Sequence, residues 1–519
     1  MQIILIIVRA LPPPPTPGGR AAAAQTGEKR MFVQASGITS AGSGRAARRV
    51  FAGAGFLAFF AASPALAQTQ GAAADPNFLT GLFAPSRANL LGDMGGLRTA
   101  IGRYGFSLNI VETSEVLGNV SGGIHRGFDY DGLTTMTLGL DTAKAFGWEG
   151  GSFNVSALQI HGRNLSADNL ASLQTASGIE AERATRLWEL WYQQEFLEGD
   201  ASLKLGQQSI DQEFMTSQYS ALFVNTVMGW PMVPSVDLFA GGPAYPLSSL
   251  GVRLKAQPAP ALTLLGGVFN DNPPGGPFDD DSQLRGAEKS GTAFNLNTGA
   301  LFIAEMQYTI NQPAMGEMTA PGQSTGLPGT YKLGMWYDTA RFPDQRFDNT
   351  GLSLADPASS GVARTHSGNF SVYGVADQMV WRPDPDSPQS VGVFARLMGA
   401  PSDRNLVDFS VNAGVTLKAP FHGRDDDTVG LGYGLANVSG RASDLDRDSN
   451  FFSPASPIPV RSKEQFIELT YQYQAAAWWQ IQPDFQYVFN PGAGIANPNN
   501  TGQRVGDEAV IGIRTVITF

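Results

Sequence analysis

The chain has 519 residues, no cysteine, 61 glycines and only 16 % charged residues, with a formal net charge of −11. Soluble proteins carry about 25 % charged residues, and a mean hydropathy of −0.10 is too low for a bundle of membrane-spanning helices. The lack of cysteine excludes a disulfide framework and thiolate chemistry, and the acidic charge disfavours nucleic acid as a partner.

Residues 31–67 have the parts of a secretory signal peptide. A basic stretch precedes the apolar stretch Val50–Ala62, and Ala65 and Ala67 supply the small residues that a signal peptidase reads. We predict cleavage after Ala67. A retained membrane anchor is the alternative interpretation.

From about residue 104 onward the chain repeats one pattern, in which about ten residues alternate between apolar and polar before a turn rich in Gly, Pro, Asn and Asp. Alternation with period two is typical of strands with one apolar face. About sixteen strands are expected: Tyr104–Val116, Leu133–Phe146, Ser152–Arg163, Leu187–Phe196, Ala201–Ser209, Ser248–Gln257, Ala261–Asn270, Leu301–Asn311, Thr330–Ala340, Phe370–Trp381, Gln389–Met398, Leu406–Leu417, Thr428–Val438, Gln465–Gln474, Trp479–Phe489 and Glu508–Phe519.

Short and long connections alternate along this series. Segments such as "WEGG", "EGDA" and "QPAPA" are tight turns, whereas five connections are long and polar. This asymmetry is expected of outer-membrane barrels, which have short periplasmic turns and long extracellular loops. The five long connections are Asn164–Thr185, Ile210–Leu247, Asp271–Ala300, Arg341–Asn369 and Ser439–Lys463.

The last predicted strand runs to the final residue, Phe519. A strand with an uncovered edge recruits other chains, and a closed barrel removes the edge by pairing the last strand with the first. We therefore predict an all-β fold, an antiparallel outer-membrane barrel of about 16 strands around a water-filled lumen.

The domain organisation follows from these patterns. Residues 1–67 form the signal region, in which 1–30 are interpreted as an upstream extension of the gene model because the signal is complete from Met31. Residues 68–100 form a linker and a periplasmic or plug element, and residues 101–519 form the barrel.

Aromatic residues gather near the ends of the predicted strands, where amphipathic rings prefer the membrane interfaces. Packing into a core is the alternative, but no segment is expected to supply an opposing layer. The aromatic residues concerned are Trp148, Trp188, Tyr192, Trp381, Trp478, Trp479, Tyr487 and Phe489.

The two faces of each strand can be assigned from alternation. In "LWELWYQQEF" the apolar face carries Trp188, Leu190, Tyr192 and Phe196, and the other residues are expected in the lumen. A lumen of mixed charge with Gln and Trp suits neutral polyhydroxylated solutes, whose hydroxyls exchange hydrogen bonds and whose rings stack on aromatic faces. The candidates from alternation are Glu189, Trp191, Lys204, Arg253, Trp336, Asp338, Arg396 and Glu468. A plain solvated wall is the alternative for each of them.

Six motifs in order resemble the carbohydrate-selective porins of the OprB type. They are "LLGDMGGLRTAIGRYG", "LKLGQQSIDQEF", "GGVFNDNPPG", "WYDTARFPD", "APSDRNLVDFSVNAGV" and "IQPDFQYVFNPGAG". The resemblance covers roughly residues 79–519, and Met94 stands where the family usually has Trp. It implies a 16-stranded outer-membrane channel of a Gram-negative bacterium that passes monosaccharides such as glucose by facilitated diffusion. It also implies a loop that folds inward, and it adds Arg186 and Asp211 to Glu189 and Lys204 as residues in matching motifs.

The expected partners are monosaccharides, outer-membrane lipid, lipopolysaccharide and, through the strand ending in Phe519, the barrel-assembly machinery. No cofactor is expected, and association into a homotrimer is left open. The alternatives are a general or small organic-acid porin on the same barrel, a periplasmic binding protein, and a barrel enzyme using His161, Ser166 and Asp168.

Two acidic runs could bind calcium, Asp279–Asp281 and Asp425–Asp427. Neither follows an alternate-residue ligand pattern with the sharp glycine of known calcium loops. Solvated loop tips are therefore the favoured interpretation, and no metal site is predicted.

Overall fold

In a computed structural model of the protein, residues 87–275, 290–312, 326–385 and 387–519 are described. The prediction of about sixteen antiparallel strands in a closed barrel is confirmed, and β1 and β18 pair to complete the ring. The strands of the barrel are β1 (Phe106–Ser121), β2 (Gly127–Asp141), β3 (Gly151–Gly162), β4 (Ala184–Phe196), β5 (Ala201–Gln208), β6 (Ser249–Ala259), β7 (Leu262–Asn270), β8 (Ala300–Ile310), β9 (Gly329–Asp348), β10 (Ala363–Trp381), β11 (Ser390–Gly399), β12 (Val407–Lys418), β13 (Thr428–Val438), β14 (Lys463–Ala476), β15 (Trp479–Phe489) and β18 (Glu508–Thr518).

Alternation along β9 shows why these residues form a barrel wall. Leu333 and Met335 are 61 % and 48 % exposed on the outer face. Trp336 and Asp338, which point the other way, are 1 % and 0 % exposed. An apolar outer face with a mixed inner face is the pattern of a barrel that meets lipid outside and water or protein inside.

The seam between the first and last strands is covered by the opening motif. The main-chain N–H of Leu90 donates to the carbonyl of Thr518 at 2.8 Å, and the N–H of Phe519 donates to the carbonyl of Ile110 at 2.9 Å. The Arg98 side chain, on helix α3 (Leu97–Gly102), donates to the carbonyl of Phe519. The predicted segment 68–100, described from residue 87, thus docks at the strand ends.

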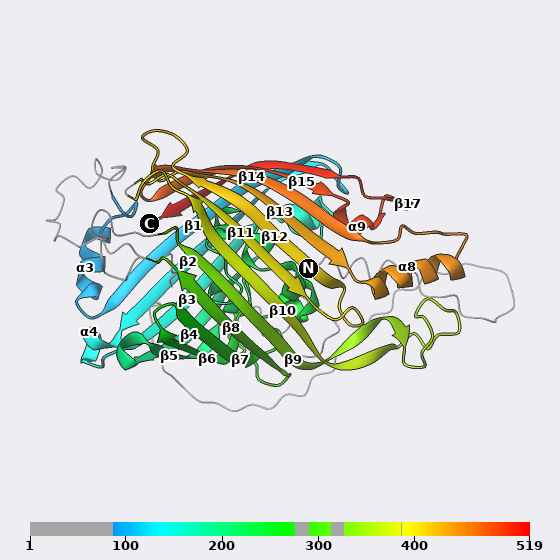
Figure 1. The fold of residues 1–519 in the computed structure, drawn as a ribbon, viewed down its shortest axis with the longest axis horizontal. Coiled ribbons are helices and arrows are strands. Elements are labelled where there is room, and N and C mark those ends of the chain that lie inside the picture. The colour runs from blue at the N-terminus through cyan, green and yellow to red at the C-terminus, as the bar shows by residue number, and fades with distance from the viewer. Residues whose placement is uncertain (1–86, 276–289, 313–325, 386) are drawn as a thin grey trace, which may run out of the picture.

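The two ends of the barrel differ. Figure 1 shows α3, α4 (Thr142–Phe146) and the C-terminus at one end, and α8 (Gly440–Phe452) with a long β9–β10 hairpin at the other. The remaining short elements are η1 (Met94–Gly96), α5 (Leu165–Asp168), η2 (Leu197–Gly199), η3 (Ile210–Gln212), η4 (Ser220–Leu222), α6 (Thr226–Gly229), α7 (Met232–Asp237), η5 (Phe239–Gly241), α9 (Pro491–Gly494), β16 (Ala496–Asn497) and β17 (Asn500–Arg504). None of the described helices has the length and apolar character needed to cross a membrane.

Two of the five predicted long loops have regular structure that was not expected. The Arg341–Asn369 connection is largely strand, because β9 and β10 pair as far as Asp348 and Ala363. The Ser439–Lys463 connection contains α8, whose first turn is capped by the Ser439 hydroxyl accepting from the N–H of Ala442 at 3.3 Å.

Two other long connections fold into the barrel. We call residues 163–183 the first inner segment and residues 209–248 the second inner segment. The largest apolar cluster lies between the second inner segment, with Met228 and Val233 at its centre, and the inward faces of β7–β15. The expectation that no segment supplies an opposing layer was therefore wrong, because the barrel carries its own core inside the lumen.

This inner packing corrects the placement of one tryptophan, Trp188. Trp188 was expected on the outer face, but it is buried with Leu158 and Ile160 against the first inner segment. A β-bulge between β3 and β4 shifts the register at this point, so one residue flips to the other face. Trp478 is also buried, whereas Trp148 remains exposed at a strand end.

Candidate functional site

A cavity of about 510 Å³ opens inside the barrel at the end that carries α3 and α4. Its walls come from β1–β5 and from the start of the second inner segment. Three predicted lumen residues, Glu189, Trp191 and Lys204, line it together with Glu213 and Asn154. This volume lies within the range of small-molecule sites, about 300–1,000 Å³.

Charged side chains in and beside the cavity form one ion cluster. Lys204 forms an ion pair with Glu213, and Arg253 Nε lies 2.6 Å from the Glu213 Oε2. Arg253 also donates to the Gln193 side-chain carbonyl at 2.7 Å. The ammonium of Lys204 lies 4.6 Å from the ring centroid of Trp191, a cation–π distance. Two cations therefore share one carboxylate beside an aromatic face.

The carboxylate of Glu189 lies on another side of the same cavity. It accepts from the main-chain N–H of Ser209 at 3.1 Å, which ties β4 to the start of the second inner segment. Next to it, Asp211 accepts from the Ser209 hydroxyl at 2.7 Å and from the N–H of Tyr245 at 3.0 Å. Asp211 thus closes the second inner segment on itself.

Arg396 does not face open lumen. Its guanidinium donates to the main-chain carbonyls of Met215 at 2.8 Å and of Met228 and Gly229, each at 3.1 Å, and to the Asn412 side chain. These carbonyls belong to the second inner segment. Arg396 therefore holds this segment against β11.

Glu468 on β14 also binds the main chain of the second inner segment, but as an acceptor where Arg396 is a donor. Its carboxylate accepts from the main-chain N–H groups of Val224 at 2.5 Å and Asn225 at 3.2 Å. A buried carboxylate that accepts main-chain N–H groups is a strong anchor, because such hydrogen bonds are charge-assisted. The wall thus presents an acceptor to one part of the second inner segment and a donor to another.

Two further wall residues in this set were missed by sequence reasoning. Glu305 accepts from the N–H of Met215 at 2.7 Å, and Asp377 accepts from the Ser217 hydroxyl at 2.6 Å. Alternation places Glu305 on the same face of β8 as Leu301. Because that face also carries apolar residues, it was not recognised as the inward face. A lone acidic residue on an otherwise apolar inward face is the signal that could have found it.

The first inner segment is anchored in the same way. Glu464 accepts from the N–H groups of Leu173 at 2.7 Å and Gln174 at 2.8 Å, and Glu508 accepts from that of Ala171 at 3.1 Å. These carboxylates lie on β14 and β18. Both inner segments are therefore fixed to the wall through their own main chains.

The remaining candidates are dispersed. Arg186 is buried on β4, Trp336 is buried in the apolar cluster, and Asp338 lies near the α8 end of the barrel. Of the ten predicted site residues, the structure thus gathers Glu189, Trp191 and Lys204 around one cavity with Arg253 beside them. Arg396 and Glu468, on the wall strands β11 and β14, instead bind the main chain of the second inner segment.

The residues of the alternative enzyme do not meet. His161 Nε2 lies 3.0 Å from the Tyr130 hydroxyl, whereas Asp168 accepts from Arg163 at 2.9 Å. The Ser166 hydroxyl accepts from the N–H of Ala176. The three side chains therefore have separate partners.

The two acidic runs have different outcomes. Asp279–Asp281 lie outside the described residues. In the other run, Asp427 is fully buried and accepts from Arg424 at 2.6 Å and from the N–H of Gln474 at 2.9 Å. Asp427 is thus a turn anchor and not a solvated tip. Within the described residues, no three His, Cys, Asp or Glu side chains form a metal-binding group.

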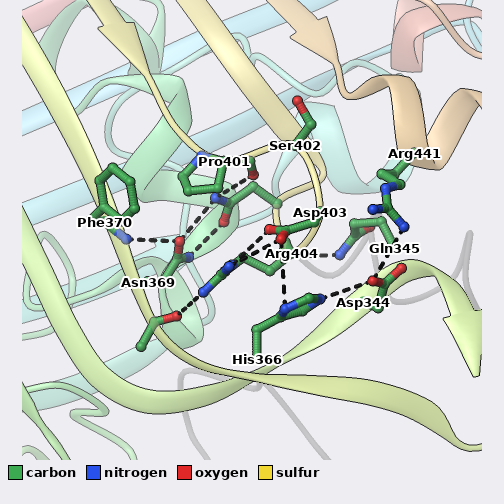
Figure 2. A network of polar contacts seen from close by, with 12 residues as sticks. Asp344, Gln345, His366, Asn369, Phe370, Pro401, Ser402, Asp403, Arg404 and Arg441 are labelled. Carbon is green, nitrogen blue, oxygen red and sulfur yellow. Dashed lines mark hydrogen bonds and ion pairs between the residues drawn. The ribbon is translucent and has the colours of Figure 1, made fainter. Parts of the chain in front are cut away.

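A polar network fixes the projecting hairpin at the α8 end (Figure 2). The His366 Nε2 lies 2.9 Å from Asp344 Oδ2, and its Nδ1 lies 3.6 Å from Asp403 Oδ2. From α8, Arg441 approaches Asp344 at 3.5 Å, and on the β11–β12 turn Arg404 pairs with Asp403 at 2.8 Å. The network therefore ties the β9–β10 hairpin to α8 and to the β11–β12 turn.

Comparisons with known proteins agree with this geometry. The family model described as "Carbohydrate-selective porin, OprB family" matches residues 125–519. Porin B of Pseudomonas aeruginosa is 27 % identical over 428 residues, which are 79 % of this chain and 88 % of that protein. The putative porin QuiX of Acinetobacter baylyi is 24 % identical over 460 residues, or 84 % of this chain and 94 % of that one. The high-pH structure of Pseudomonas putida OprB has a TM-score of 0.73 at 23 % identity, and covers 84 % of this chain and 100 % of its own.

Proposed function

Because the chain belongs to the carbohydrate-selective porin family of the OprB type, we propose that it passes monosaccharides of about the size of glucose, recognising them in the cavity beside Trp191. It is a porin of the Gram-negative outer membrane, and a carbohydrate channel. The size of the solute and the residues that contact it are the proposal.

The observation that carries the proposal is the meeting of Trp191, Lys204, Glu189 and Glu213 at one cavity. A sugar ring presents an apolar C–H face to an aromatic ring and hydroxyls around its rim. Ammonium donors and carboxylate acceptors side by side match hydroxyls that both give and take hydrogen bonds. The two cations Lys204 and Arg253 are matched by the two carboxylates of Glu213 and Glu189, and this balance of charge favours a neutral solute over an ion.

The inner segments supply the narrowing that selectivity requires. The second inner segment packs its apolar side chains on β7–β15, while the cavity is lined by β1–β5 and by Gln212 and Glu213. The proposal is that solutes pass along the polar side of this segment. The end that carries α3 and the short turns is taken as periplasmic, and the α8 end as extracellular.

Single-channel conductance in planar bilayers tests the function. Glucose, other sugars and small organic acids are titrated onto the refolded chain. Saturable block by monosaccharides, without block by acids, is the expected result. Current that is unaffected by sugars supports a general pore instead, and saturable block by acids supports the small organic-acid porin.

Further parts of the proposal concern assembly. Residues 31–67, outside the described residues, are proposed to direct secretion. The strand that ends at Phe519 is proposed as the recognition element for the barrel-assembly machinery. Contact with lipopolysaccharide and association into a homotrimer are proposed on the fold alone.

A further inference from the structure

Two buried carboxylates face each other at the extracellular end of the barrel. Asp271 follows the last residue of β7, and Asp338 lies on β9 opposite Leu301 of β8. Both side chains are 0 % exposed. A Cβ at Gly299, just before β8, would meet both the Asp271 Oδ2 and the hydroxyl of Thr339, so the Asp271 carboxylate lies beside the β9 residue that follows Asp338. The two carboxyl groups interact across the start of β8.

One oxygen of each carboxylate is fully used. The Asp271 Oδ1 accepts from the Thr298 hydroxyl at 2.6 Å and from the N–H of Gly299 at 2.8 Å. The Asp338 Oδ1 accepts from the N–H of Ala340 at 2.8 Å. These bonds fix both side chains in place, so their direction is set by the main chain.

The second oxygen of each carboxylate has no donor. The Oδ2 atoms of Asp271 and Asp338 are both buried without a hydrogen-bond partner. The Oδ1 of the next residue, Asn272, is also buried without a donor. Gly299 permits the approach, because a Cβ there would overlap the Asp271 Oδ2. Two buried carboxylate oxygens, one on Asp271 and one on Asp338, therefore have no hydrogen to satisfy them.

Within the part of the chain that the structure describes, no cation compensates the two charges. Among the ion pairs of the described residues, none involves Asp271 or Asp338. An uncompensated pair of buried carboxylates is strongly unfavourable, and proteins resolve it with a bound cation or a shared proton. The paired geometry thus calls for a positive charge between the two Oδ2 atoms.

We propose that Asp271 and Asp338 bind a divalent cation, with Ca²⁺ as the ion of best fit. The donors are hard oxygen atoms without sulfur or imidazole, which favours Ca²⁺ over Zn²⁺ or Cu²⁺. Ca²⁺ also accepts irregular geometry and water ligands, which suits a site with two carboxylates at a strand end. The ion ties the base of the β7–β8 connection to β9, and this role is independent of the solute.

Calcium binding is tested on the full chain refolded in detergent without lipopolysaccharide. The melting temperature is measured in Ca²⁺ and in EGTA, and Tb³⁺ luminescence excited through tryptophan is competed with Ca²⁺. We expect Ca²⁺ to raise the melting temperature, increasingly with concentration. Asp271→Asn and Asp338→Asn, which keep the side-chain shape, are expected to lose the shift and to weaken competition at least about tenfold.

Asp237→Asn is the matched control. Asp237 is also buried with a donorless Oδ2, but its Oδ1 accepts from the N–H of Leu406 on the β11–β12 connection. This variant is expected to keep the full calcium shift. Folding of each variant is checked by its heat-modifiable mobility on gels.

Two outcomes overturn the proposal. A wild-type chain that ignores Ca²⁺, with Asp338→Asn more stable in both buffers, identifies a shared proton instead. A calcium shift that persists in both Asn variants places the ion elsewhere.

Discussion

The side chain of Arg98 donates a hydrogen bond to the main-chain carbonyl of Phe519, 421 residues away. Its Nε also donates to the carbonyl of Leu108 at 3.2 Å, on the first strand. One guanidinium thus holds both strands of the closing seam, which explains an arginine in the opening motif. The main chain bends sharply before it, with a φ of 69° at Gly95 and 94° at Gly96.

Arg98→Ala is expected to weaken the seam. Charge-assisted hydrogen bonds to the main-chain oxygens of Gly92, Leu108 and Phe519 are lost, so the free energy of unfolding should fall by about 1–2 kcal/mol, discounted for partial exposure. Urea titration of the folded, heat-modifiable form measures this. Arg103→Ala, an exposed arginine at the end of the same helix, is the control. Equal unfolding midpoints for the two variants would contradict the role of Arg98.

Glu468→Ala is expected to loosen the second inner segment. The N–H groups of Val224 and Asn225 lose their buried acceptor, at a cost of about 1–3 kcal/mol. Single-channel recordings should show a noisier current and a larger mean conductance. Glu468→Gln, which keeps one acceptor oxygen, should lie between this variant and the wild type. Glu149→Ala, in an exposed turn, should leave the trace unchanged, and a quiet Glu468→Ala channel would refute the anchoring.

Trp191→Ala is expected to weaken sugar block in the same recordings. Loss of an aromatic face costs about 0.5–1.5 kcal/mol beyond buried area, or about 2- to 12-fold in apparent affinity. Trp148→Ala, on the outer surface, is the control. Unchanged block in Trp191→Ala would move the sugar site away from this cavity.

The β9–β10 hairpin is expected to detach in acid. Burial on its own raises the pKa of Asp344, but hydrogen bonds from the N–H groups of Phe347 and Arg346 and from His366 outweigh it, and the pKa is lowered. A lowered pKa contributes stability that is complete above the ordinary aspartate pKa of about 3.9 and is lost as the pH falls through the lower folded value.

Hydrogen exchange of the hairpin measures this pH dependence. Protection should persist from pH 7 to about 4.5 and fall below about pH 3.5. Asp344→Asn should have low protection throughout, whereas Asp356→Asn, on the hairpin loop, should follow the wild type. A pH-independent protection profile in the wild type would exclude the Asp344 network as the cause.

Alternation alone was sufficient to predict the barrel, because each strand must present apolar atoms to one side over its whole length. It failed at Trp188, where a one-residue bulge exchanges the faces. It also could not anticipate α8, whose polar sequence reads as a loop and whose fixed position depends on ion pairs from Asp444 and Asp448 to Arg346, about a hundred residues away.

The candidate site was partly predictable for a related reason. Alternation correctly placed Arg396 and Glu468 inside the barrel, but an inward direction does not distinguish open water from an inner segment. That distinction depends on whether Met228 and Val224 occupy the space, and they are distant in sequence. Trp191 and Lys204 meet because β4 and β5 are consecutive strands, a relationship that the sequence order contains.

The interior position of residues 163–183 and 209–248 dictates where this protein can be labelled on living cells. Long connections in exposed positions are the usual places for inserted epitopes and fluorophores. Leu170 and Met228, each 0 % exposed, lie in connections where an inserted tag would be hidden and would obstruct the pore. With the α8 end extracellular, as proposed, an antibody on intact cells should reach a tag in the loop between β9 and β10, where Asn349 and Gly361 are exposed.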